Sequence, residues 1–264
     1  VIGYRILNRI KYDDMSFGSD YRERARKIAT LFRREYASLR SQYDNPTNLF
    51  FFQKIMSGYI YKGPVIEWYI RIKMKIEQYY ELYNRIIPHN ARITDIGCGY
   101  GTLCFMLGVL SEKRIVTGID YDKEKIDVAK SSWLSGGNIN FIHADAMSFE
   151  FPDSDVFVMN DVLHYLMPGE QELLLNRILP RVKSGGFLIL RDGDSEKVKD
   201  HKVTKITEWF SIKALGFNKA LHPPCFTSGS KIKEIAERMD CIVEEMRNDK
   251  LTSNTIYIIK PKQE

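Results

Sequence analysis

Three glycines at alternate positions, Gly97, Gly99 and Gly101, follow an apolar, β-branched run that contains Asp95. A helical pattern of apolar residues begins directly after them, at Thr102. Glycine adopts left-handed backbone conformations easily, and its missing Cβ lets a ligand approach the backbone closely. The stretch therefore predicts a strand, a tight turn and a helix N-terminus whose amides face a carboxylate or a phosphate.

The spacing of these glycines separates two nucleotide-binding classes. Dinucleotide-binding folds carry G-x-G-x-x-G, whereas this chain has G-x-G-x-G preceded by Asp95, which disfavours an NAD-dependent enzyme. The motif resembles the first motif of class I S-adenosylmethionine-dependent methyltransferases. That resemblance implies that Gly97, Cys98, Gly99 and Gly101 wrap the methionine part of the cofactor, and that Asp95 helps to hold its ammonium group.

Two further strand ends carry the residues expected of a nucleoside site. Asp120 ends a second short strand, where a carboxylate suits a bidentate hydrogen bond to two vicinal ribose hydroxyls. The next residue, Tyr121, is expected to lie against the adenine. A third strand over 139–142 leads to Asp145 and Ala146, which by the same resemblance face the adenine amino group and ring nitrogen. Each carboxylate alone fits an ordinary turn, but their order along the chain favours the methyltransferase fold.

A fourth strand, over 155–161, is expected to end beneath the sulfonium, with Asn160 in the cofactor site. Methyl transfer needs alignment and desolvation, and it needs a general base only if the acceptor begins as a hydroxyl or an ammonium. His164 is the first candidate for that base because imidazole titrates near neutral pH. Asp161 and Tyr165 are second choices, and packing beneath the cofactor is the alternative role for His164.

The alternation of strands and helices predicts an α/β fold with a Rossmann-like, seven-stranded methyltransferase sheet. The sheet is expected to be mostly parallel, with an antiparallel hairpin over 241–245 and 255–259 at its C-terminal end. We expect a helical N-terminal extension over 1–64 and the methyltransferase domain over 65–264. A helix over 65–87 is expected to cap the cofactor, and residues 191–229 form a predicted lid insertion.

Composition excludes several classes of site. The four cysteines form no C-x-x-C pair, which argues against zinc or any other metal and against a disulfide framework, and indicates a reducing compartment. No apolar run reaches the length of a membrane span. The chain begins at Val1 without a signal peptide, so we expect a piece of a larger, cytoplasmic protein.

Most of the net charge of +5 belongs to the N-terminal arm. A basic amphipathic helix is expected over 20–43. It packs its apolar stripe on the main domain or, as the alternative, contacts anionic lipid at the inner face of a membrane.

Motifs that are missing from the sequence argue against some classes of methyl acceptor. Methyltransferases that act on amino groups of DNA bases or glutamine carry (Asn/Asp)-Pro-Pro-(Tyr/Phe) after the fourth strand, and residues 160–163 depart from it. No basic stripe with interleaved aromatics runs through the catalytic half, which disfavours nucleic acid. A small-molecule or lipid-like acceptor remains, with methylation at oxygen.

One further resemblance concerns the N-terminal arm. Residues 14–22 resemble the C-terminal tail of bacterial 1-acylglycerol-3-phosphate acyltransferases, and residues 59–64 joined to a methyltransferase are similar to bacterial fusions of the two domains. The acyltransferase's own His and Asp motif is absent from this sequence. The alternative function is a catalytically silent, S-adenosylmethionine-binding regulatory or interaction module of a larger acyltransferase-type protein.

Overall fold

A computed structural model describes residues 46–76, 79–196, 223–246 and 254–262. The chain divides into two compact units, residues 1–76 and residues 77–264. The predicted boundary after residue 64 stays a prediction. The basic helix predicted over 20–43 and most of the predicted insertion over 191–229 lie outside the described residues.

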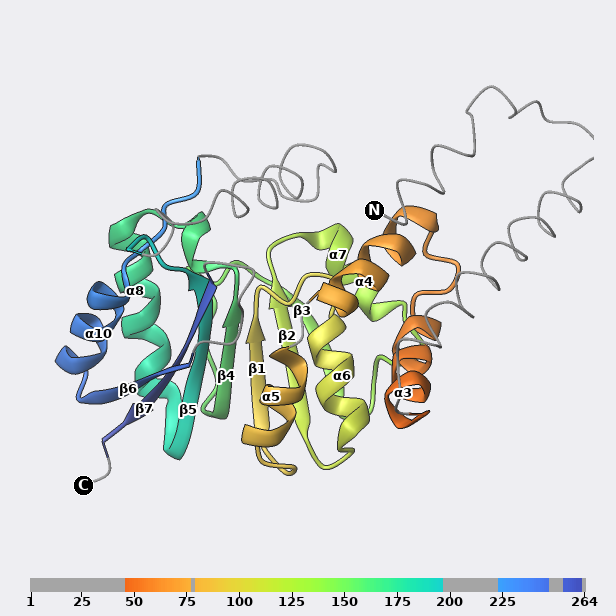
Figure 1. Cartoon of the computed structure of the whole chain (residues 1–264), viewed down its shortest axis with the longest axis horizontal. Helices are drawn as coiled ribbons and strands as arrows, with labels where there is room; N and C mark the ends of the chain where they lie inside the picture. The colour runs from red at the N-terminus through yellow and green to blue at the C-terminus, as the bar shows by residue number, and fades with distance from the viewer. Residues whose placement is uncertain (1–45, 77–78, 197–222, 247–253, 263–264) are drawn as a thin grey trace, which may run out of the picture. The chain divides into compact units, whose positions relative to one another are not determined.

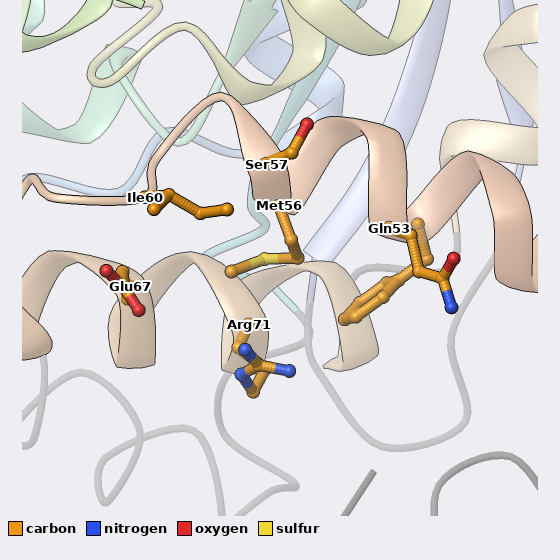
Figure 2. Close-up of a pocket in the computed structure, with 7 residues that line it drawn as sticks. Gln53, Met56, Ser57, Ile60, Glu67 and Arg71 are labelled. Atoms are coloured by element: carbon orange, nitrogen blue, oxygen red, sulfur yellow. The ribbon is translucent and has the colours of Figure 1, made fainter. Parts of the chain in front are cut away.

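The described part of the first unit is a pair of helices, α3 (Pro46–Ser57) and α4 (Pro64–Ile76). Each helix begins with a proline, which suits the first helical position because its fixed φ is already helical. A hollow of about 180 Å³ lies between the two helices. Figure 2 shows that α3 and the turn after it supply the apolar side and α4 a charged side, and the lining residues are Phe52, Gln53, Met56, Ser57, Ile60, Glu67 and Arg71.

The second unit is built on a seven-stranded sheet in the order β3-β2-β1-β4-β5-β7-β6 (Figure 1). The first five strands pair in parallel, and β7 and β6 pair antiparallel. The predicted Rossmann-like sheet with its antiparallel C-terminal hairpin is therefore confirmed. The strands are β1 (Arg92–Ile96), β2 (Ile115–Asp120), β3 (Ile139–His143), β4 (Ser154–Asn160), β5 (Val182–Gly193), β6 (Cys241–Met246) and β7 (Asn254–Pro261).

Helices alternate with the strands and surround the sheet (Figure 1). The predicted helix over 65–87 is found as two helices, α4 and α5, with residues 77–78 outside the described residues. Among the described residues, no helix is both long enough and apolar enough to span a membrane. The helices of the second unit are α5 (Tyr79–Ile86), α6 (Thr102–Leu110), α7 (Lys123–Lys130), η2 (Leu163–Tyr165), α8 (Pro168–Ile178), η3 (Leu179–Arg181) and α10 (Gly229–Arg238).

Strand β4 shows why the centre of the sheet holds together. Its residues Val156, Phe157, Val158 and Met159 are all completely buried. A continuous apolar run of this kind is typical of a parallel strand that is covered on both faces. The run ends at Asn160, which is only half-buried, so the tip of the strand brings a polar side chain to the edge of the core.

Arg114 fixes α5 to the body of the second unit. Its guanidinium is completely buried and donates hydrogen bonds to the Asn84 side chain (2.8 Å) and to the carbonyls of Asn84, Ile87, Pro88 and Leu107. A buried arginine is stable only when its donors are satisfied. The end of α5 is consequently held to Arg114, directly before β2, and through it to α6.

The sheet order locates the place where a ligand binds. The chain runs from β1 toward β2 and β3 in one direction, and from β4 toward β5 in the other. Ligands of open α/β sheets bind beyond the carboxyl ends of the strands at such a switch point. The tips of β1 and β4 are adjacent, since Ile96 pairs with Met159, and they are the expected floor of the site.

Candidate active site

The glycine loop takes the conformation that its sequence predicts. Gly97, Gly99 and Gly101 have φ values of +73°, +56° and +79°, all in the left-handed region. A Cβ on Gly97 would lie 2.2 Å from Cγ2 of Val162, and a Cβ on Gly101 would lie 2.5 Å from the Phe141 ring. A Cβ on Gly99 would meet nothing within 4 Å. The two outer glycines are required by packing, and the middle one leaves backbone open to a ligand.

Asp95 lies behind this loop, and it is buried. The Cys104 thiol donates to Oδ2 of Asp95 at 3.2 Å. Burial raises the pKa of the Cys98 thiol and raises that of Cys104 well above its ordinary value. Both thiols therefore stay protonated at neutral pH, which makes them packing groups of the loop and poor nucleophiles.

Asp120 connects the tip of β2 to the glycine loop. Its Oδ2 accepts from the Gly99 amide (2.7 Å), and its Oδ1 accepts from the Asp122 amide (2.8 Å). Each carboxylate oxygen has a second lone-pair site. The two amide bonds hold the carboxylate in one orientation, in which it still has acceptor capacity for a diol.

The residues predicted to contact the adenine follow β2 and β3, the two strands at one edge of the sheet. Asp145 is exposed, and its Oδ1 accepts from the Met147 amide at 2.9 Å. The carbonyl of Ala146 accepts from Arg177 at 2.9 Å. Tyr121 is half-exposed, with His143 Nε2 3.0 Å from its carbonyl oxygen. The structure thus places Asp145, Ala146 and Tyr121 after β3 and β2, in the order that the sequence predicts.

The tip of β4 is held by side chains from distant parts of the second unit. The Tyr83 hydroxyl donates to Oδ1 of Asn160 at 2.6 Å. Asp161 has a left-handed φ of +54°, forms an ion pair with Arg191, and accepts from Asn254 at 3.0 Å. Both oxygens of Asp161 are engaged in this network, which fixes an otherwise strained turn.

His164 and Asp192 form a buried pair across the tips of β4 and β5. Nδ1 of His164 lies 2.7 Å from Oδ1 of Asp192, and the His164 backbone amide donates to Oδ2 at 3.1 Å. The Asp192 carboxylate is almost fully buried. Rings of Tyr165 and Phe226 lie 4.1 and 5.1 Å from the imidazole. A carboxylate beside Nδ1 holds the imidazole in one orientation.

Gln171 ties the His164 loop to the segment that follows residue 222. Its buried amide donates to the carbonyls of Leu163 (3.1 Å), Leu166 (3.0 Å) and Cys225 (2.6 Å). The Cys225 amide in turn donates to the His164 carbonyl at 2.7 Å. The backbone on both sides of His164 is therefore fixed by one side chain of α8.

No metal centre is found in the part of the chain that the structure describes, because no three His, Cys, Asp or Glu side chains are grouped there to hold an ion. The chemistry available from these residues is ligand binding along the strand tips and proton transfer at the His164 imidazole.

A family model described as a methyltransferase domain matches residues 93–186. The matched range includes the glycine loop, Asp120, Asp145 and His164, but ends before Asp192. It covers all the residues that the sequence analysis assigns to the nucleoside.

Sequence relatives cover part of the chain. A carboxy-S-adenosyl-L-methionine synthase of Campylobacter jejuni subsp. doylei is 33% identical over 118 residues, which is 44% of this chain and 48% of the relative. A protein of the same name from Campylobacter lari is 27% identical over 128 residues, covering 47% of this chain and 53% of the relative. The chain spans about half the length of the relatives that it matches.

Solved structures of methyltransferases resemble a larger part of this chain than the family model covers. Human N-acetylserotonin methyltransferase, in complex with S-adenosylmethionine, has a TM-score of 0.57 and 15% identity over 78% of this chain and 58% of its own. Magnesium protoporphyrin IX methyltransferase from Synechocystis, with bound S-adenosylhomocysteine, has a TM-score of 0.55 and 16% identity over 86% of this chain and all of its own. At these identities the likeness shows the fold alone.

Sequence reasoning missed four partners of the methyltransferase site: Asp192, Arg191, Gln171 and Tyr83. The predicted insertion begins at residue 191 and therefore includes Asp192, whereas β5 continues to Gly193. The available signal was an acidic residue at a strand end, the feature that identified Asp120. Gln171 and Tyr83 lie within helical patterns, where no local signal marks a buried polar contact.

Proposed function

We propose that the methyltransferase domain binds S-adenosylmethionine across the tips of β3, β2, β1 and β4, and transfers its methyl group to a hydroxyl of a small-molecule or lipid-related acceptor. The observation that supports this proposal best is the His164–Asp192 pair. His164 belongs to the loop whose Val162 side chain lies against Gly97 of the glycine turn. A base oriented by a buried carboxylate is the arrangement that deprotonation of a hydroxyl requires.

The sheet order assigns the parts of the cofactor to residues. Asp145 and Ala146 follow β3 and would face the adenine, with Tyr121 against its ring, and Asp120 at the tip of β2 would accept from the ribose hydroxyls. The open backbone at Gly99, with Asp95 behind it, would face the amino-acid part. The methyl group is then directed toward the tip of β4, on the side of the sheet where His164 lies.

The reaction is an in-line displacement at carbon. The acceptor oxygen attacks the methyl carbon, the carbon–sulfur bond breaks, and the sulfonium becomes the neutral thioether of S-adenosylhomocysteine. The proton of the hydroxyl passes to Nε2 of His164, while Asp192 stabilises the imidazolium that forms. Asp161 is less suited to this task because Arg191 and Asn254 already engage its carboxylate.

The proposal of a lipid-related acceptor rests on two observations. Residues 14–22 resemble an acyltransferase tail, and residues 59–64 resemble acyltransferase–methyltransferase fusions. The catalytic half also lacks the basic stripe with interleaved aromatics that would favour a nucleic acid. The proposal that oxygen is the methylated atom rests on His164 as a general base. Contact of residues 20–43 with a membrane surface is part of the same proposal.

Calorimetry and product analysis test the proposal together. We expect the chain to bind S-adenosylmethionine and S-adenosylhomocysteine, and to release S-adenosylhomocysteine only when a hydroxyl acceptor is supplied. Failure to bind either nucleoside would refute the assignment. Binding without turnover on any hydroxyl acceptor would favour the catalytically silent module.

The named relatives favour a second candidate, in which the bound nucleoside is a carboxylated S-adenosylmethionine. Mass spectrometry of the nucleoside that co-purifies with the protein separates the two. S-adenosylmethionine or its demethylated product supports the first proposal, and a nucleoside heavier by one carboxyl group supports the second.

A further inference from the structure

Two tyrosines on one face of α5 contact two paired residues of the sheet. Tyr83 is completely buried, and its hydroxyl lies 2.6 Å from Oδ1 of Asn160. Tyr79, one turn earlier, has its ring 4.4 Å from the Arg191 guanidinium carbon. Asn160 and Arg191 are direct neighbours in the pairing of β4 with β5. One helix face therefore fixes the tips of both strands.

The position of Tyr83 is itself well determined. Its ring packs against that of Tyr79, with 4.9 Å between the centroids. The next residue, Asn84, is held through both its side chain and its carbonyl by the buried Arg114. A hydroxyl on such a rigid support holds its partner in one orientation at little further entropic cost.

The order of the strands in the sheet indicates which end of the cofactor would lie beside Asn160. β4 lies on the opposite side of β1 from β2 and β3, so its tip is remote from the residues assigned to ribose and adenine. It is next to the glycine loop, since Gly97 touches Val162 just beyond Asn160. Asn160 is therefore placed at the amino-acid end of the ligand.

We propose that Tyr83 is a positioning residue of the cofactor site: its hydroxyl holds the amide oxygen of Asn160, so that the amide nitrogen is directed at the amino-acid carboxylate of the cofactor. This inference rests on the proposed function. The chemistry is complementary, because an amide nitrogen carries two donors and a carboxylate accepts only. Without the hydroxyl, the amide is free to rotate, and its oxygen can face the carboxylate.

Two nucleosides that differ only at one end give the test. S-adenosylhomocysteine and 5′-methylthioadenosine are both neutral thioethers, but the second lacks the amino-acid group. We expect Tyr83→Phe to weaken binding of S-adenosylhomocysteine by about three- to tenfold, the effect of one neutral hydrogen bond. Binding of 5′-methylthioadenosine, measured by the same calorimetry, should be unchanged.

Two further variants show that the effect runs through Asn160. Tyr80→Phe removes a hydroxyl from a neighbouring buried tyrosine on the same helix and should leave both affinities unchanged. In an Asn160→Ala background, Tyr83→Phe should weaken S-adenosylhomocysteine binding no further, because the two changes remove one interaction. Thermal unfolding confirms that each variant is folded.

The outcomes separate this inference from the function on which it rests. Equal losses for both nucleosides, or no loss for either, would overturn the role of Tyr83 while leaving cofactor binding by the unmodified chain intact. A chain that binds neither S-adenosylmethionine nor S-adenosylhomocysteine would refute the proposed function, and the positioning role with it. An additional loss in the Asn160→Ala background would also overturn it.

Discussion

The two sides of β1 differ in the longest-range contacts that hold them. On the cofactor side, meaning the glycine loop and the tips of β2 and β3, Asp120 binds an amide 21 residues away, and Ala146 binds Arg177, 31 residues away. On the acceptor side, meaning the tips of β5 and β7 with the loop from Asp161 to Tyr165, the contacts join residues 28 apart (His164 with Asp192) and 93 apart (Asn254 with Asp161).

This difference in range suggests a division of labour. A short motif that folds on itself suits a ligand whose shape never changes, such as a nucleoside. Contacts gathered from many parts of the chain can each be replaced separately, which suits an acceptor that differs between enzymes. If the division holds, variants of His164 and Asp192 change turnover but not cofactor affinity, and variants of the glycine loop and Asp120 change affinity first.

The largest effect is expected on the acceptor side, for His164→Ala. Loss of the general base should lower turnover by about 10²- to 10⁴-fold, measured as release of S-adenosylhomocysteine, with cofactor affinity unchanged in calorimetry. His89→Ala, which removes an exposed histidine, is the control. If turnover were the same in both variants, His164 would be a packing residue and the acceptor side would lack its base.

Asp192→Asn should have the next largest effect. The imidazole remains but loses the carboxylate that orients Nδ1, so turnover should fall about 100-fold at constant cofactor affinity. Asp194→Asn is a matched control. It alters another buried strand-end carboxylate, whose partners are Tyr257 and the amides of Glu196 and Gly229. Equal turnover in these two variants would contradict an orienting role for Asp192.

On the cofactor side, Asp120→Ala should weaken S-adenosylmethionine binding by about 1.5–3 kcal/mol, because it removes a charge-assisted bidentate contact. Calorimetry measures this directly. Asp122→Ala removes the N-cap of α7 and should lower stability by about 1 kcal/mol with little change in affinity. Unchanged binding by the Asp120 variant would remove the ribose assignment.

The smallest effects distinguish two glycines of one loop. Gly99→Ala should cost about 1–2 kcal/mol of unfolding free energy through its left-handed φ and should block the open backbone, weakening cofactor binding. Gly97→Ala adds a clash with Val162 and should destabilise the fold more than Gly99→Ala does. Urea unfolding compares the two. If the order of stability were reversed, Gly97 would not be the packing glycine.

The cofactor side could be predicted from sequence because its signals are local. Glycines at alternate positions and carboxylates at successive strand ends are visible within a few residues, and the parallel sheet follows from the alternation of strands and helices. The loop to Tyr165 was also located. Its supports were not, because Asp192, Gln171 and Tyr83 become neighbours of the loop only after β5, α8 and α5 have packed.

The described segments before residue 197 and after residue 222 are held by contacts to each other and to α8. The Ser195 amide binds the Thr227 carbonyl at 3.0 Å, and Gln171 holds Cys225 beside His164. Cys225 is thus held to the His164 loop by a side chain of α8. A substitution of Gln171 would therefore release the backbone on both sides of the imidazole at once.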